Sequence, residues 1–377
     1  MATTDSPPVG AILPDDLITE ILIRLPVKYI FRCQSVSKAW LSLIKNPNFV
    51  KSQLRHSIES FNTNQTLIVN TLDEYEESHT SISLLSVDFR RIVARLRFPF
   101  SRGEFDYVPD CILVGSANGI VCLSVALSET PPEYKWHCSP FANRETNTYL
   151  WNPATRQSKV IPSYSICHDY RREALGFGFD PIDNDFKVVR IVAPPFSAEV
   201  YSANRNAWRK LPGPVVLPFD DAFDVCVNGF LCCTGLYGVM AFDLNKEVMN
   251  SGLKFPVTTS NARVTEFDAS IALLLWRNKN SSNQIDMWKL DDEACLRGGG
   301  VEASWTIVFS VDLDLTVDSV HGYLPRGDIL LMTDEGVWCL YDTNKKKATI
   351  VPVAIDMHQT FKYTESLVSV SGFKQVN

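Results

Sequence analysis

Residues 13–50 read LPDDLITEILIRLPVKYIFRCQSVSKAWLSLIKNPNFV, and this stretch decides how the chain is organised. Pro14 suits the first turn of a helix, and Asp15 and Asp16 follow where acidic side chains meet the positive end of a helix dipole. Apolar residues then recur at helical spacing until Pro26, which ends the helix. These apolar residues are Leu17, Ile18, Ile21, Leu22, Ile23 and Leu25.

Two more short helices are expected after Pro26. The first is a single turn through residues 29–31, and the second closes before Pro47. Its apolar residues follow the spacing i, i+3, i+4, i+7, i+8: Val36, Ala39, Trp40, Leu43 and Ile44. Three short helices within about 40 residues bury only a small core. The first helix, which is apolar nearly all round, then has more apolar surface than its two neighbours can cover.

Two interpretations explain this surplus apolar surface. In one, it packs against the large region that follows in the chain. In the other, which we favour, a separate protein covers it, as when a helix is recognised in a groove. The charge is compatible with such a partner being acidic. Residues 1–56 contain seven Lys/Arg and four Asp/Glu, a net of +3, whereas the whole chain carries −7, so the remainder carries −10.

Composition limits the class of protein. The 377 residues are 45% hydrophobic and 21% charged, as in ordinary globular domains, and the length suggests roughly two or three of them. The acidic balance, with a pI near 5.5, argues against a nucleic-acid partner. No apolar stretch approaches the roughly 18–20 residues that a membrane helix needs, so no membrane association is expected.

The ten cysteines lack C-x-x-C spacing, and most stand in apolar runs where a free cysteine behaves as a small buried hydrophobe. Residues 1–10 are polar and show no signal for secretion. Together these features favour a reducing compartment, the cytoplasm or the nucleus.

The N-terminal segment resembles an F-box. The motif is L-P-x-D-L at 13–17, E-I-L-x-R-L-P-V-K at 20–28, V-S-K-x-W-x-x-L-I at 36–44 and P-x-F at 47–49. The departure is Tyr29–Cys33, where the family usually has Ser-Leu-x-Arg-Phe. The resemblance implies a small three-helix module over residues 10–56 that binds the Skp1 adaptor and, through it, the cullin of a ubiquitin ligase. It also implies that the following residues form either the Skp1-binding face or the small core behind it: Leu13, Pro14, Leu17, Ile21, Leu22, Leu25, Pro26, Val27, Ile30, Val36, Trp40, Leu43 and Ile44.

From about residue 65 the hydrophobic period becomes that of strands, in short runs bounded by Gly, Pro, Asn and Asp. A unit recurs in which a strand reaches an aromatic residue and an Asn/Asp turn follows. The aromatic positions are Trp151, Tyr201, Phe242, Trp288 and Tyr341, spaced by 41 to 53 residues. Periods near 40–50 with several strands each predict propeller blades. A degenerate unit at 83–99 makes six, and a strand at 365–370 is expected to pair with 66–69 and close the ring. A β-sandwich is the alternative.

Residues 57–377 resemble the kelch-like F-box-associated interaction domain of plant F-box proteins. The matching stretches are G-S-A-N-G-I-V-C at 115–122, L-W-N-P-A-T-R at 150–156, G-F-G-F-D-P at 176–181, 185–191, V-N-G at 227–229, F-D-L at 242–244 and E-S-L-V at 365–368. One departure is F-L-C-C at 230–233, where the family often shows a Leu-His-Trp-like run. The resemblance implies an all-β recognition domain carried behind the helical module.

No motif for catalysis or cofactor binding emerges. G-F-G-F-D-P is not a phosphate-binding loop, and P-loop, H-E-x-x-H and G-x-S-x-G motifs are absent from the sequence. The only Cys/His pairs, at 137–138 and 167–168, stand about 30 residues apart, unlike zinc ligands. We therefore expect no catalytic residues, no metal and no cofactor.

Recognition is expected in the longer polar or Pro-rich loops, since a propeller leaves specificity to its rims. These loops are 101–110, 128–148, 163–173, 213–224, 278–283 and 292–303. The longest contains Tyr134, Trp136 and Phe141, which are candidate contacts for a target protein or else fold back onto the domain.

The resulting functional hypothesis is a non-catalytic substrate receptor of a Skp1–cullin–F-box (SCF) ubiquitin ligase with an unknown target protein. Within this class, the plant resemblance extends to S-locus-type F-box proteins, which recognise pistil ribonucleases. The alternatives are an F-box protein that acts as a scaffold outside a ligase, and a propeller enzyme, glycan-binding protein or other binding protein whose helical head is merely structural.

Overall fold

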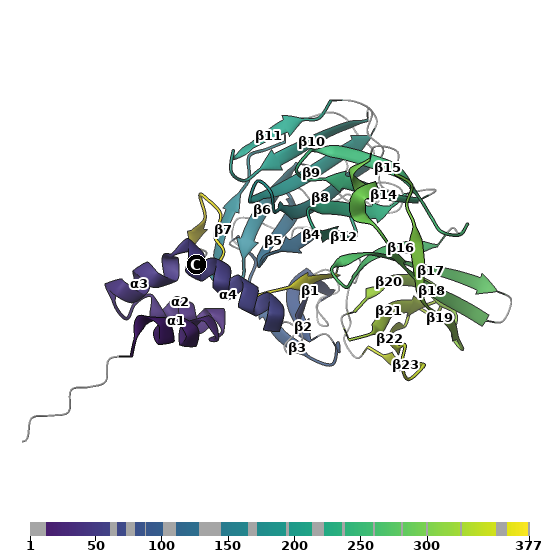
Figure 1. Ribbon diagram of the computed structural model, residues 1–377, viewed down its shortest axis with the longest axis horizontal. Coiled ribbons are helices and arrows are strands. Elements are labelled where there is room, and N and C mark those ends of the chain that lie inside the picture. Colours follow the sequence, from purple (N-terminus) through teal and green to yellow (C-terminus); the bar gives the residue numbers. More distant parts are fainter. Residues whose placement is uncertain are drawn as a thin grey trace, which may run out of the picture.

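The computed structural model has a helical head at one side of a ring of six β-sheets (Figure 1). It describes residues 13–60, 66–72, 80–86, 88–100, 111–127, 145–164, 172–193, 196–212, 222–235, 238–258, 261–279, 282–298, 301–324, 326–351 and 360–375. We call residues 13–60 the head and the six sheets the ring.

The head contains helices α1 (Asp15–Ile23), α2 (Val27–Cys33), α3 (Lys38–Lys45) and α4 (Pro47–Glu59). The three predicted helices are confirmed, and α4 is an addition. Pro47 ends the preceding helix, but it also occupies the first turn of α4, where a missing N–H costs nothing. Local caps fix these boundaries: the Ser37 hydroxyl accepts the Trp40 N–H at 3.2 Å, and the Asn46 side chain accepts the Asn48 N–H at 2.8 Å.

Each sheet is an antiparallel blade, and the predicted count of six is confirmed. Blade 1 contains β24 (Thr360–Tyr363), β1 (Thr66–Leu72), β2 (Thr80–Ser86) and β3 (Ile92–Leu96). Blade 2 contains β4 (Cys111–Ala117), β5 (Ile120–Ala126), β6 (Thr146–Asn152), β7 (Gln157–Val160) and the outer strand β25 (Lys374–Gln375). Blade 3 contains β8 (Arg172–Asp180), β9 (Asp185–Ala193), β10 (Ser197–Ser202) and β11 (Ala207–Lys210).

Blade 4 contains β12 (Val225–Val227), β13 (Phe230–Thr234), β14 (Gly238–Asp243) and β15 (Val248–Lys254). Blade 5 contains β16 (Ala262–Phe267), β17 (Ser270–Lys279), β18 (Ser282–Leu290) and β19 (Trp305–Leu313), with a 3₁₀ helix, η4 (Glu293–Arg297), between its last two strands. Blade 6 contains β20 (Val317–Tyr323), β21 (Asp328–Thr333), β22 (Trp338–Asp342) and β23 (Lys347–Ile350).

The ring is closed by a C-terminal strand, although not by the predicted residues. β24 pairs with β1, with Tyr363 opposite Thr66 and Thr360 opposite Val69. Residues 364–373, which we call the strap, leave β24 and run beside the head. The prediction placed the closing strand at 365–370. Those residues belong to the strap instead, where Ser366, Leu367 and Val370 are buried outside a sheet.

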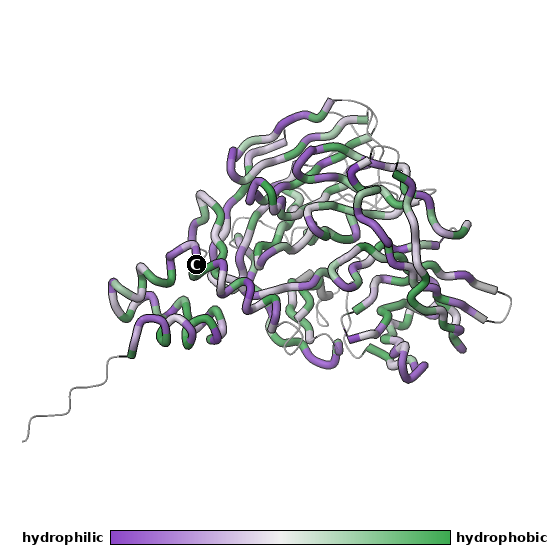
Figure 2. Tube along the Cα trace, viewed as in Figure 1, coloured by the Kyte–Doolittle hydropathy of each residue, from purple (hydrophilic) through white to green (hydrophobic). Residues whose placement is uncertain are grey.

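The five repeated aromatic residues occupy equivalent places, the third strand of blades 2 to 6. Trp151, Tyr201, Phe242 and Tyr341 are buried, and Trp288 is partly buried in the core between blades 4 and 5. Figure 2 shows hydrophobic residues recurring along the strands of the ring and along the helices. The repeat therefore marks packing between blades.

Turn direction divides the ring into two sides. Because the four strands of a blade are antiparallel in sequence, the turns between strands one and two and between three and four lie at one end. The turns between strands two and three, and the crossovers between blades, lie at the other end. The strap and the turns at 118–119 and 153–156 place the head at the first end, which we call the head side. We call the other end the opposite side.

Candidate interaction surfaces

The structure divides the thirteen candidate head residues into a core and a surface. Four are buried: Leu22, Val27, Ile30 and Ile44. Three are partly buried: Leu25, Trp40 and Leu43. Six are exposed: Leu13, Pro14, Leu17, Ile21, Pro26 and Val36. Helical spacing alone does not make this division, since α1 is apolar on all sides.

The exposed residues include an apolar row, Leu13, Leu17 and Ile21. Leu17 and Ile21 are four residues apart on one face of α1, and Leu13 precedes that helix; the three side chains are 50%, 52% and 50% exposed for Leu17, Ile21 and Leu13. Tyr29 of α2 and Val36, in the turn between α2 and α3, add exposed apolar surface, at 52% and 64%. Single exposed apolar residues are common, but a row of them in so small a module is typical of an interaction surface.

The other face of the head is joined to the ring. Leu367 of the strap packs in the same hydrophobic cluster as Leu22, Ile30 and Phe49, and Ala154 of blade 2 lies against that cluster. The surplus apolar surface of α1 is thus covered in part by the ring, while the row at Leu13, Leu17 and Ile21 stays exposed.

A buried amide completes the junction between the head and the ring. Gln53 of α4 is 1% exposed, and its Oε1 accepts the backbone N–H of Leu367 at 3.3 Å. Its Nε2 donates to the Ser57 hydroxyl at 2.8 Å.

Glu365 of the strap lies near the start of α2. Desolvation raises the pKa of its carboxyl, and the backbone N–H of Val27 and the charge of Lys28 partly offset this effect.

Most of the longer loops predicted for recognition lie outside the described residues, but the ends of the strands that flank them are on the opposite side. The strands that flank residues 101–110, 128–144, 165–171 and 213–221 all end there, as do β17 and β18, which flank 280–281. The segment between β18 and β19 is different, because it joins the third and fourth strands of blade 5 and lies on the head side. The candidate aromatics Tyr134, Trp136 and Phe141 lie outside the described residues.

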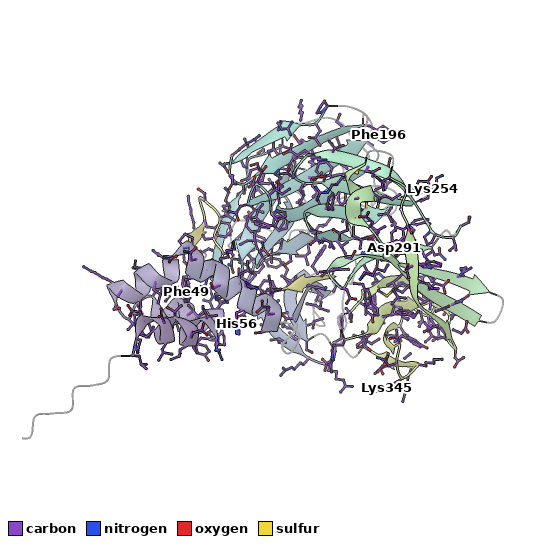
Figure 3. All side chains as sticks on the ribbon, in the orientation of Figure 1. Phe49, His56, Phe196, Lys254, Asp291 and Lys345 are labelled. Atoms are coloured by element: carbon purple, nitrogen blue, oxygen red, sulfur yellow. The ribbon has the colours of Figure 1, made fainter. Side chains whose placement is uncertain are left out.

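Phe196 is an aromatic residue on the opposite side that the sequence analysis did not single out. It precedes β10 in the turn between the second and third strands of blade 3 and is 61% exposed. Figure 3 shows it at the margin of the ring, far from Phe49 in the head. An exposed aromatic beside a strand end is a suitable contact residue for a protein partner.

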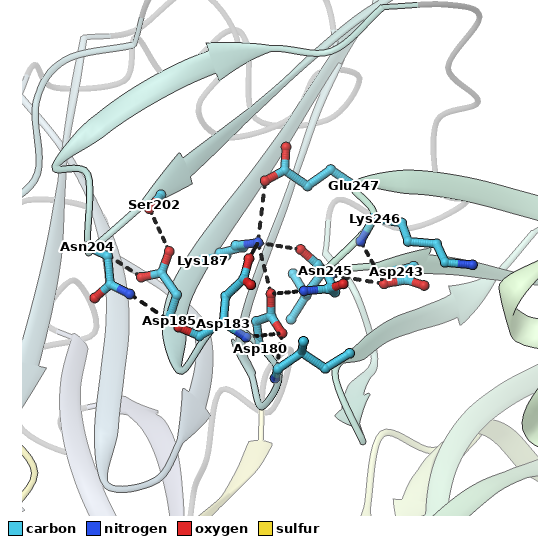
Figure 4. Close-up of polar contacts among 12 residues, drawn as sticks. Asp180, Asp183, Asp185, Lys187, Ser202, Asn204, Asp243, Asn245, Lys246 and Glu247 are labelled. Atoms are coloured by element: carbon cyan, nitrogen blue, oxygen red, sulfur yellow. Dashed lines mark hydrogen bonds and ion pairs between the residues drawn. The ribbon is translucent and has the colours of Figure 1, made fainter.

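The most prominent polar cluster serves to join two blades (Figure 4). Lys187 of blade 3 is buried, and its Nζ donates to Asp180 Oδ2 at 3.0 Å and to the Leu244 carbonyl of blade 4 at 2.7 Å. Glu247 of blade 4 lies 3.4 Å from the same ammonium. Desolvation acts to raise the pKa of Asp180, but hydrogen bonds led by that from Lys187 outweigh it, so the net pKa is lowered. Because these groups satisfy one another away from solvent, we assign the cluster to structure.

A second buried cluster is similar in kind. Arg190 of β9 forms ion pairs with Glu173 of β8 and, at 2.9 Å, with Glu199 of β10, and all three side chains are buried. The Tyr164 ring lies 3.9 Å from the guanidinium carbon. The cluster cross-links three strands of one blade.

The described cysteines are free thiols, and most are buried. Burial raises the pKa of Cys226 to about 12 and also raises that of Cys122 and Cys232, which keeps these thiols protonated and unreactive.

The Cys/His pairs at 137–138 and 167–168 lie outside the described residues. Within the described ranges, no three His, Cys, Asp or Glu side chains are grouped as a metal site would require. No described helix has the length and apolarity needed to span a membrane.

Two family models match the chain. One, described as the F-box domain, matches residues 11–52, and the other, described as the F-box associated beta propeller domain, matches residues 76–366, which is more than half of the chain. The chain belongs to the F-box-associated β-propeller family. Both resemblances noted in the sequence are thereby confirmed.

Individual relatives agree with this assignment. F-box protein CPR1 of Arabidopsis thaliana is 25% identical over 91% of this chain and 85% of its own length. F-box protein At2g21930 of the same plant is 28% identical over 75% of this chain and 69% of its own. Among solved structures, TolB from Acinetobacter baumannii shares 10% identity over 84% of this chain and 73% of that one. The TM-score of that comparison is 0.44.

In this F-box protein, sequence reasoning found the residues of the head but missed how the head is joined to the ring. Gln53, Leu367 and Asn152 make that junction, and Asn152 was seen only as a turn residue. A glutamine on the buried face of an amphipathic helix indicates a hydrogen-bond partner elsewhere in the fold, since a buried amide needs one. The sequence, however, does not show that the partner lies more than 300 residues away.

Proposed function

We propose that this F-box protein is a non-catalytic substrate receptor of an SCF ubiquitin ligase, in which the head binds a Skp1-type adaptor and the ring binds a target protein. Adaptor and target are then held at fixed positions, and proximity raises the effective concentration of the target for ubiquitin transfer. The membership of the chain in an F-box family supports this role in general.

The observation that carries the proposal for the head is the apolar row at Leu13, Leu17 and Ile21. About half of each side chain is exposed; Leu17 and Ile21 stand on α1, whose other face is anchored, and Leu13 precedes that helix. A partner that covers this row would gain the hydrophobic contribution of three side chains at little cost in ordering them. The basic excess of the head, seven Lys/Arg against four Asp/Glu among residues 13–60, would suit an acidic adaptor surface.

For the ring, the opposite side is the proposed target surface. The strands that flank most of the longer loops end there, and the contacts of the head with the ring lie at the other end. A target on the opposite side and an adaptor on the head would not compete for the same surface. We further propose that the protein acts in the cytoplasm or nucleus, for which the supporting observation is its free, buried cysteines.

A double variant of the row tests the adaptor assignment. Leu17→Glu with Ile21→Glu places two carboxylates where apolar contact is expected, so affinity for a purified plant Skp1-type adaptor should fall by about tenfold or more. Binding to the full chain is measured by calorimetry, with helical content checked by circular dichroism. Ile58→Glu on α4 is the matched control, because Ile58 is also 50% exposed but lies outside the row.

The proposal for the head fails if the double variant binds the adaptor as tightly as the unmodified chain, or if the unmodified chain does not bind it. A loss that is equally large for Ile58→Glu would also contradict the assignment to this row. For the ring, Phe196→Ala should weaken capture of a target while leaving adaptor binding unchanged.

A further inference from the structure

A cavity of about 430 Å³ opens at the seam where blade 6 meets blade 1 on the head side. We call it the seam cavity. Its walls come from the turn at 88–90 of blade 1, from the turn and strand start at 326–328, and from β22, β23 and the turn between them. Leu340, which is 9% exposed, belongs to the hydrophobic cluster that seals the same seam deeper in the ring.

Charged side chains form a row across the blade 6 wall. In the strand register, Asp328 of β21 lies opposite Asp342 of β22, and Asp342 lies opposite Lys347 of β23. Side chains that are directly opposite in a sheet project to the same face. The carboxylates of Asp328 and Asp342 therefore lie on the same face as directly opposite residues, and two like charges in that position are unfavourable.

The ionic groups of the cavity only partly neutralise one another. Lys345 pairs with Asp342 at 2.7 Å, and Asp342 also accepts the N–H groups of its own turn. Arg90 lies 3.9 Å from Asp88. Three further charged groups line the cavity: Arg326 and Lys347, which are exposed, and the half-buried Asp328. Within the described ranges, none of their side chains makes a hydrogen bond or an ion pair, although the charge of Arg326 acts on both Asp88 and Asp328.

The pKa of Asp328 indicates that its carboxylate would be stabilised by a further cation. Burial raises the pKa of its carboxyl, and the neighbouring charge of Asp342 raises it further, against opposing effects of Arg326 and Lys345. A bound ammonium group at Asp328 would lower that pKa again.

At the seam between blades 3 and 4, a side chain closes the head-side rim that is open between blades 6 and 1. There, Lys187 reaches across to the Leu244 carbonyl and Glu247, and its side chain is only 3% exposed (Figure 4). The corresponding rim between blades 6 and 1 is lined with side chains of both signs but is not closed by them. Its volume is within the roughly 300–1,000 Å³ of typical small-molecule sites.

We propose that the seam cavity binds a small zwitterion. The ligand would carry a carboxylate or phosphate group for Arg326 and Lys347, and an ammonium group for Asp328. Arginine and lysine both bind such oxyanions through charge-assisted hydrogen bonds. These three residues belong to blade 6, and Asp88 and Arg90 of blade 1 line the facing wall, so a ligand that fills the cavity would also reinforce the seam at which the ring closes. This site is independent of the proposed ligase role.

The test titrates the full chain with four probes in calorimetry and thermal-shift measurements. Phosphoethanolamine carries a phosphate and an ammonium, 4-aminobutyrate carries a carboxylate and an ammonium, and inorganic phosphate and ethanolamine carry one sign each. At least one zwitterion should bind about tenfold more tightly than either single-charge probe, and should raise the melting temperature. The better zwitterion identifies the anionic group.

Variants show whether the named residues are responsible. Arg326→Gln and Asp328→Asn should each weaken the preferred zwitterion by about tenfold. Arg205→Gln, at an exposed head-side turn of blade 3, should have no effect and is the matched control. Unchanged melting temperatures without ligand show that the variants fold. Equal binding of phosphate alone with no effect of Asp328→Asn would overturn the proposal in favour of a simple anion site. Failure of both zwitterions to bind at up to about 10 mM would overturn it outright.

Discussion

At the scale of single residues, Gly119 is required for two reasons, its local backbone conformation and its close contact with the distant strap. It has a φ of +82° in the turn between β4 and β5, a conformation that side chains with a Cβ rarely adopt. A Cβ there would lie 2.2 Å from the Ser366 hydroxyl and 2.8 Å from the Thr364 carbonyl. The Ser366 hydroxyl in turn donates to the Asn118 carbonyl at 2.6 Å. The glycine therefore permits the strap to lie against blade 2.

Gly119→Ala should be more destabilising than an alanine at a glycine of similar backbone conformation. Gly336, with a φ of +76° and open space around its Cβ position, is the matched control. Both changes should cost about 1–2 kcal/mol through the left-handed backbone, and Gly119→Ala should cost a further 1–3 kcal/mol through overpacking against the strap. Urea unfolding of the two variants measures this difference. Equal losses would mean that the strap moves away freely.

At the scale of elements, one turn type recurs with different tasks. Asn152 and Asp342 each come directly after one of the repeated aromatic residues, at the last position of the strand. Each side chain accepts two backbone N–H groups of the turn that follows. Asn152 does more, since its amide nitrogen donates to the strap carbonyls of Ser366 at 3.0 Å and Val368 at 2.8 Å. It is fully buried, so these bonds have no replacement from solvent.

The near-isosteric exchanges Asn152→Asp and Asp342→Asn should therefore differ in effect. Asn152→Asp keeps the turn acceptor but sets a carboxylate against two carbonyls, which should reduce the free energy of unfolding by about 2–4 kcal/mol. Asp342→Asn loses an exposed ion pair with Lys345 but also removes the repulsion from Asp328, so its cost should be much smaller than that of Asn152→Asp. Denaturant unfolding followed by tryptophan fluorescence gives both values. Similar costs would show that Asn152 acts only as a turn residue.

These elements also show what the sequence does and does not reveal. The third strands of five blades could be predicted, because an aromatic followed by an Asn/Asp turn is local chemistry. The closing strand was placed several residues too late, because Thr66 and Tyr363 are 297 positions apart and nothing local distinguishes a paired strand from a buried strap. Helix α4 was missed because Pro47 fits both the end of one helix and the beginning of another.

At the scale of the whole molecule, the head and the ring share a core. The candidate residues of the head could be named from its motif, but their division into core and surface could not. Leu17 and Leu22 are equally apolar, yet one is 50% and the other 2% exposed. The difference depends on where α4 and the strap lie, and the strap comes from the far end of the chain. The same contacts hold the proposed adaptor surface at a fixed place relative to the ring.

Leu367→Ala tests whether this shared core holds the head in place. Leu367 is 7% exposed and packs with Leu22, Val27 and Phe49, so removing its side chain should leave a cavity costing about 2–5 kcal/mol. Its backbone N–H still donates to Gln53, so the loss is one of packing. We expect faster amide hydrogen exchange in α1 to α3 than in blades 3 to 5, because the cavity opens beneath the head. Leu253→Ala in blade 4, where Leu253 is 2% exposed, is the matched control and should leave exchange in the head unchanged. If Leu367→Ala does not raise exchange in the head, the helices are stable without the strap. Adaptor and target surfaces would then be joined only through the chain connection between α4 and β1.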